Sequence, residues 1–160
     1  MTVRNIFKRE EGFTLIELLV VIGILAILLA ITLIAINPAR QFGLANDTKR
    51  RSDINAVLNA IGQYTASNGG NLPASVTGLT AGAAATGLSS TTALTALCAD
   101  LVPTYISALP EDPNVANGQA GVDQAGCAGA WNTQYSVARD ANNRITVSAT
   151  GYSGPITVTR

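Results

Sequence analysis

The chain has 160 residues and a mass of 16.4 kDa, and its ten Lys and Arg balance its ten Asp and Glu, so its formal net charge is zero. This length allows one globular domain plus any anchor. The neutral balance argues against direct nucleic-acid binding, which needs a basic face. The chain contains no His, which excludes Ser-His-Asp and Cys-His catalysis and zinc sites that need imidazole. Because no other constellation of side chains indicates a reaction, we expect a protein that is not an enzyme.

The first long element is an apolar run over residues 13–36 that contains one charged side chain, Glu17. As a helix it measures about 36 Å, which exceeds the ~30 Å of a bilayer's hydrocarbon core. The run is too long for the apolar region of a signal peptide, and the rest of the chain is too polar and small to bury it as a core helix. The sequence therefore predicts a membrane-inserted helix. Basic residues flank both ends of the run, so charge alone leaves its orientation undecided.

Glu17 is the unusual residue of this run. A carboxylate among Leu and Ile side chains is costly unless it is shallow, protonated or paired. Glu17 lies four residues after Phe13, about one helical turn, so a free amine at Phe13 is the obvious cationic partner. That amine exists only if the chain is cut between Gly12 and Phe13.

The stretch from Gly12 to Ile22 (GFTLIELLVVI) follows a short basic leader and opens the apolar run. This combination resembles the processing site of type IV pilins and type II secretion pseudopilins, and the resemblance is strong over residues 1–40. It implies that a membrane prepilin peptidase cuts after Gly12 and methylates the new amine of Phe13. It also implies that Glu17 pairs with the N-terminal amine of a neighbouring subunit during filament assembly.

The resemblance further implies a location and partners. Residues 1–12 would be a cytoplasmic leader, and the globular part would lie outside the cytoplasm. The implied partners are identical or homologous pilin subunits, the prepilin peptidase, a pilus assembly platform and the cytoplasmic membrane. After the cut, the side chains of the mature protein number seven basic and eight acidic, and the helix loses the polar head that holds it at the cytoplasmic face.

Residues 37–68 are predicted to continue the helix in amphipathic form. Asn37 and Pro38 predict a kink or local unwinding, because proline removes a backbone hydrogen bond and disfavours the α conformation in the residue before it. Gly43 weakens the helix again. Four apolar residues then recur at helical spacing and predict a stripe that faces a domain core: Ile54, Val57, Leu58 and Ile61. The basic residues 49–51 before this stripe are either a solvated face or a contact with acidic groups of another subunit or with lipid headgroups.

Residues 69–160 are predicted to form a globular head. The expected fold is α+β and pilin-like, with the second half of the long helix packed on a small antiparallel sheet. Nineteen of the 24 residues in 74–97 are Ala, Gly, Ser or Thr, which predicts a variable, poorly ordered loop. A short helix is expected to begin near Ser90–Thr92 and to end at Pro103. Alternating apolar residues in 131–160, interrupted by turns, predict about three antiparallel strands.

The head contains both cysteines of the chain, Cys98 and Cys127. Outside the cytoplasm we expect them to form a disulfide, which chain-entropy estimates value at about 3–4 kcal/mol; the alternative is two buried thiols. Three residues with side-chain oxygens, Asp112, Asn114 and Asp123, are either turn formers or, as in some pseudopilins, ligands of Ca²⁺. We expect no other cofactor.

These features favour a structural subunit of a type IV pilus-like filament, a class that serves adhesion, motility, DNA uptake or secretion. One alternative is a type II secretion pseudopilin, which shares the processing site. Another is a membrane-anchored glycan- or calcium-binding module that does not polymerise. Glu17 argues against this last alternative, because a simple tether gains nothing from a buried acid beside a cleavage site.

Overall fold

The structure is a computed structural model that describes residues 12–115 and 120–160. The expected leader therefore lies outside the described residues, except for Gly12. The chain divides into two compact units, Met1–Gln41 and Phe42–Arg160, which we describe separately.

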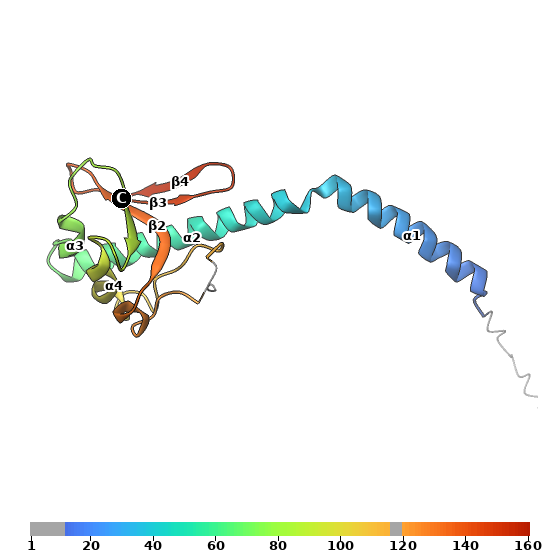
Figure 1. The fold of residues 1–160 in the computed structure, drawn as a ribbon, viewed down its shortest axis with the longest axis horizontal. Helices are drawn as coiled ribbons and strands as arrows, with labels where there is room; N and C mark the ends of the chain where they lie inside the picture. Colours follow the sequence, from blue (N-terminus) through green and yellow to red (C-terminus); the bar gives the residue numbers. More distant parts are fainter. Residues whose placement is uncertain (1–11, 116–119) are drawn as a thin grey trace, which may run out of the picture. The chain divides into compact units, whose positions relative to one another are not determined.

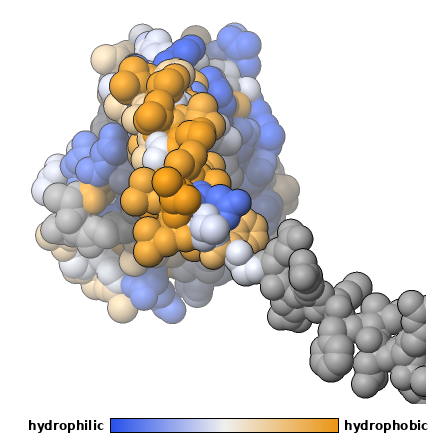
Figure 2. All heavy atoms as spheres, turned by 90° about the vertical axis from the view of Figure 1, so that its right-hand side faces the viewer, coloured by the Kyte–Doolittle hydropathy of each residue, from blue (hydrophilic) through white to orange (hydrophobic). Residues whose placement is uncertain are grey.

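The first unit is dominated by α1 (Leu15–Ile36), which Figure 1 shows as the N-terminal helix. This helix has no polar face. None of its 22 residues is buried within the chain, and its side chains form a continuous hydrophobic surface in Figure 2. By length and composition α1 is able to cross a membrane. An apolar surface on all sides has to be covered by lipid or by other protein.

A break of one residue separates α1 from α2 (Pro38–Ser67). Asn37 adopts the left-handed conformation with φ 46° and ψ 81°, which asparagine tolerates better than most residues. Its side-chain oxygen accepts a hydrogen bond from the backbone N–H of Arg40 at 3.3 Å, and Pro38, at the first position of α2, has no N–H that needs a partner. The interruption predicted at Asn37 and Pro38 is confirmed.

Gly43 does not interrupt α2, contrary to its low helix propensity. The ring of Tyr152, from the turn after the third strand, packs directly on it, and a Cβ added at Gly43 would lie 2.5 Å from Cγ of that ring. The glycine therefore provides space for Tyr152 to pack against the helix.

The second unit is an α+β head in which α2 and a four-stranded antiparallel sheet share one core (Figure 1). The strands are β1 (Thr86–Ser89), β2 (Asn132–Arg139), β3 (Ile145–Thr150) and β4 (Pro155–Thr159), in that order across the sheet. Alternate residues of β2 and β3 are buried, and all four residues of the predicted α2 stripe are buried with them. The long apolar helix and the small sheet agree with the expected pilin-like fold.

The expectation of a poorly ordered loop over residues 74–97 is wrong. This segment contains α3 (Ala74–Thr77) and β1, which makes the fourth strand of a sheet predicted to have three. All five of its large apolar side chains are buried: Val76, Leu79, Leu88, Leu94 and Leu97. The composition predicted disorder because small residues dominate the segment. The five buried apolar side chains pack into the core at wide intervals and so order the residues between them.

The short helix begins later than expected, at Thr95, and forms α4 (Thr95–Leu101). The hydroxyl of Thr92 bonds the carbonyl oxygens of Gly87 at 2.7 Å and Ser89 at 3.1 Å. These local bonds hold a turn where the pattern predicted helix. Cys98 of α4 and Cys127 of the 3-10 turn η1 (Gly126–Ala128) form the expected disulfide, with their Cα atoms 5.5 Å apart.

A buried ion triad joins α2 to two loops of the head. The Arg50 guanidinium bonds both carboxylate oxygens of Asp112, at 2.6 and 2.9 Å, and Oδ1 of Asp47 at 2.9 Å. The Arg50 side chain is 4% exposed. Asp47 also accepts the backbone N–H of Tyr152 at 2.7 Å, which ties the β3–β4 turn to the helix.

For Arg50, the triad contradicts both interpretations of the basic residues 49–51. Its side chain is buried against Asp47 and Asp112, so it faces neither solvent nor another molecule. Lys49 pairs with Asp53 at 2.8 Å, and the same carboxylate oxygen accepts the hydroxyl of buried Tyr135 at 2.8 Å. Burial and the Asp53 carboxylate raise the pKa of Tyr135, so its hydroxyl stays a donor. Arg51 alone of the three is exposed.

We predict that Arg50→Ala lowers the free energy of unfolding of the head by about 3–5 kcal/mol, because it leaves two buried carboxylates without a cation. The emission of Trp131, the only tryptophan in the chain, reports the transition in denaturant. The neighbouring exposed arginine supplies the control, and Arg51→Ala should change stability by no more than about 0.5 kcal/mol. Equal effects of the two substitutions would show that the triad is not a major source of stability.

The triad also predicts an acid-sensitive stability. The Tyr152 N–H, with help from Arg50, lowers the pKa of Asp47 against the opposing effect of burial. Burial would raise the pKa of Asp112, but the bonds from Arg50 and from the N–H of Asn114 lower it overall. Carboxyls with depressed folded-state pKa values stabilise the protein above their unfolded pKa of about 3.9 and lose this contribution as the pH falls through the folded values.

The denaturation midpoint should therefore stay level near neutral pH and fall below about pH 4. In Arg50→Ala the acid-induced loss should shrink, since protonation there relieves the repulsion between Asp47 and Asp112. Denaturant titrations of both proteins across this pH range measure the difference, and parallel curves would contradict the prediction.

Candidate functional site

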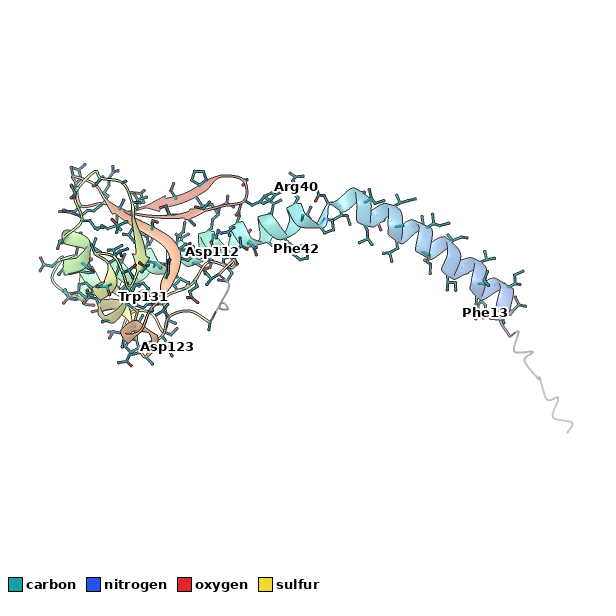
Figure 3. All side chains as sticks on the ribbon, viewed as in Figure 1. Phe13, Arg40, Phe42, Asp112, Asp123 and Trp131 are labelled. Atoms are coloured by element: carbon teal, nitrogen blue, oxygen red, sulfur yellow. A yellow bond between two sulfur atoms is a disulfide. The ribbon has the colours of Figure 1, made fainter. Side chains whose placement is uncertain are left out.

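The predicted cleavage bond lies in an exposed, non-helical segment just before α1. Gly12 and Phe13 are both exposed, and Phe13, labelled in Figure 3, keeps 81% of its surface accessible. A Cβ added at Gly12 meets no atom within 4 Å. A protease groove therefore reaches the Gly12 carbonyl without obstruction from a side chain or from the helix.

Thr14 and Glu17 form a capping box that starts α1. The Thr14 backbone is extended, with φ −81° and ψ 151°, and its hydroxyl accepts the N–H of Glu17 at 3.3 Å. In return, Oε2 of Glu17 accepts the backbone N–H of Thr14 at 2.8 Å and its hydroxyl at 2.6 Å. These bonds satisfy N–H groups that the first turn of a helix leaves free.

The capping box gives Glu17 a partner within its own chain. The negative charge lies in the first turn of α1, where the helix dipole favours it. Its second oxygen, Oε1, has no hydrogen-bond or ion-pair partner among residues 12–115 and 120–160. The arrangement holds the carboxylate at the helix end and leaves one oxygen for a cation such as an amine.

Thr14 is the site residue that the sequence analysis missed. The signal was present, because a Thr three residues before a Glu at the start of an apolar run is the sequence signature of a capping box. The predicted partner of Glu17 was a cationic amine only. The hydroxyl and N–H of Thr14 supply part of that compensation.

The three residues considered for calcium are not assembled into a site. Both oxygens of Asp112 bond Arg50. Asp123, on a different loop in Figure 3, accepts the N–H of Gly126 at 2.8 Å, and Asn114 bonds Asn46 at 3.3 Å. In the described part of the chain no three His, Cys, Asp or Glu side chains cluster as metal ligands would. Their positions agree with the turn-forming interpretation.

Comparison with known proteins identifies the N-terminal segment. The family model described as the prokaryotic N-terminal methylation motif matches residues 7–33, which include Gly12, Phe13, the capping box and most of α1. Neither a curated protein nor a solved structure gives a significant match. The resemblance noted in the sequence is thus confirmed over this segment, and the chain carries at its N-terminus the processing and methylation signature of type IV pilins and pseudopilins.

Proposed function

We propose that this chain is the precursor of a structural subunit of a type IV pilus-like filament. In this proposal the prepilin peptidase cuts after Gly12 and methylates Phe13, and the mature subunit polymerises through α1. The observation that carries the proposal is an apolar helix, exposed on every side, that begins with a capped carboxylate inside a segment matching the prokaryotic N-terminal methylation motif.

The surface of α1 supports polymerisation. Large apolar side chains project from it in all directions and the chain covers none of them. In the precursor, lipid would cover this surface and the charged leader would hold the helix at the cytoplasmic face of the membrane. Once the leader is removed, identical helices offer the same apolar cover as lipid, so the subunit moves from the bilayer into a helical bundle with little loss of burial.

Glu17 sets the register of that bundle in this proposal. The Thr14 bonds lower the cost of placing its carboxylate near the membrane while the subunit is alone. In the filament, its second oxygen receives the methylated amine of Phe13 from a neighbour. Registers that leave the carboxylate without a cation are disfavoured, and this use of a buried charge is better attested than a gain in affinity.

The head then forms the outer part of the filament and has no catalytic role. Its core, disulfide and ion triad make a stable unit. The subunit first spans the cytoplasmic membrane once, with the leader in the cytoplasm, and then enters an extracellular or periplasmic filament. A type II secretion pseudopilin would use the same processing and assembly steps.

We predict that co-expression with a prepilin peptidase yields a protein whose N-terminal residue is Phe13, with a methylated amine. Gly12→Val should block the cut, because the added side chain obstructs the peptidase groove. Gly23→Val is the matched control, since Gly23 lies within α1 and an added Cβ there also meets nothing. Intact-mass spectrometry measures all three, and filament material that still begins at Met1 would refute the processing step.

A pair of substitutions at Glu17 separates charge pairing from helix capping. Glu17→Gln keeps a side chain that completes a capping box but removes the charge, whereas Glu17→Ala removes both. If the charge pairs with a neighbour's amine, both variants insert into the membrane normally and both give few filaments. The measurement is the amount of sheared filament per membrane-inserted subunit, and normal filament yield from Glu17→Gln would contradict the role given to the charge.

A further inference from the structure

Strand β4 leaves one edge of the sheet open. It is the last strand in the order β1-β2-β3-β4 (Figure 1), and no strand lies beyond it in the part of the chain that the structure describes. Arg160, directly after β4, exchanges two backbone hydrogen bonds with Ile145, at 2.6 and 2.9 Å. Because the backbone groups of successive residues point to opposite sides of a strand, those of Val158 also face β3, and those of Thr157 and Thr159 face outward.

This open edge lacks most of the features that keep edge strands from pairing. Charged side chains, prolines and bulges usually block such edges. β4 contains no charged residue, its one proline is its first residue, Pro155, and its pairing with β3 is regular over all five residues. Among residues 12–115 and 120–160, the outward N–H groups of Thr157 and Thr159 have no backbone acceptor. The edge is therefore available to another strand.

We propose that a second copy of the chain pairs with this edge, β4 against β4 and antiparallel, while the subunit is anchored in the membrane. This inference rests on the membrane anchoring of the proposed function, but not on polymerisation. In the register that places Val158 opposite its own copy, Thr157 lies opposite Thr159 of the copy. Both such pairs exchange two backbone hydrogen bonds, so the contact forms four bonds and leaves Pro155, which has no N–H, outside it.

The side chains of β4 also fit their own copy. Val158 packs against the core but is only partly buried, and a second Val158 covers its remaining apolar surface. The two valines form a pair without mutual hydrogen bonds, in which the Cα atoms approach to about 4.5 Å. On the opposite face Thr157 meets Thr159, a favourable cross-strand pair. The contact brings no like charges together, because β4 has no charged side chain.

Membrane anchoring favours a second copy over an unrelated strand. Stable interfaces bury about 800 Å² on each partner, and an edge of five residues is small by comparison, so free heads would pair weakly. Copies anchored in one bilayer meet at a high local concentration, which strengthens a weak contact. The pair has two-fold symmetry and closes on itself. Because the neighbours within a helical filament make head-to-tail contacts instead, we assign the pair to the precursor before assembly.

Disulfide trapping tests this pairing on the full, uncut chain. The protein is expressed in membranes without peptidase and oxidised with copper phenanthroline, and the cross-linked dimer is measured on a non-reducing gel. Val158→Cys places two thiols opposite each other across the two-fold axis. Asn142→Cys, in the exposed β2–β3 turn, is the reference. We expect several-fold more dimer from position 158 than from position 142.

A further pair of substitutions shows whether the outward backbone groups hold the two copies together. In the Val158→Cys background, Thr157→Pro removes one outward N–H and no bond to β3, and an edge strand tolerates proline at such a position. Thr157→Val keeps that N–H and is the matched control. Proline should lower the dimer to the level of position 142, and valine should leave it high. The emission of Trp131 and the native disulfide report folding; if Thr157→Pro does not fold, Thr159→Pro removes another outward N–H.

Equal cross-linking at positions 158 and 142, or a dimer that the proline variant leaves unchanged, would overturn the proposal. A cross-linked product that contains an unrelated protein in place of a second copy would also overturn it. The mass-spectrometric processing assay is independent of this result, so failure of one proposal does not imply failure of the other.

Discussion

An apolar helix surface that the chain does not cover is the constraint on which the rest of the molecule depends. α1 has no buried residue and no polar face, so its stability in an aqueous cell requires lipid or other helices around it. In the proposed function, this surface lets α1 serve first as a membrane anchor and then as a polymerisation element, because lipid and neighbouring helices cover apolar side chains equally well. In that proposal, removal of a polar leader shifts the balance between the two environments, and the predicted cleavage bond lies in an open, non-helical segment.

The single acid of α1 shows how one charge is tolerated in this setting. Two donors from Thr14 bond one oxygen of Glu17, and the other oxygen has no partner among residues 12–115 and 120–160. In the proposed function, a carboxylate that is bonded through one oxygen costs little enough to persist in a lone subunit and still favours filament registers that supply a cation. Thr14 thus caps the first turn of α1 and also bonds the Glu17 carboxylate.

The head is stabilised by a buried apolar core and a buried ion triad. Its helix α2 is held by an apolar stripe along its second half and, nearer its start, by Arg50 between two buried carboxylates. The β3–β4 turn closes over this region through Asp47 and Gly43. This clamp holds the Tyr152 ring on α2 over Gly43.

The sequence by itself determined the elements whose signal is local. Continuous apolarity identified α1, helical spacing identified the α2 stripe, Asn37 and Pro38 marked the break, and alternation identified β2, β3 and β4. Only the tertiary structure decided which charges are buried, why residue 43 is a glycine, and that the small-residue segment 74–97 supplies a strand and core anchors. The reason is physical: periodicity reports which face of a segment is apolar, whereas the pairing of Arg50 with Asp112 or of Tyr152 with Gly43 depends on groups that only folding brings together.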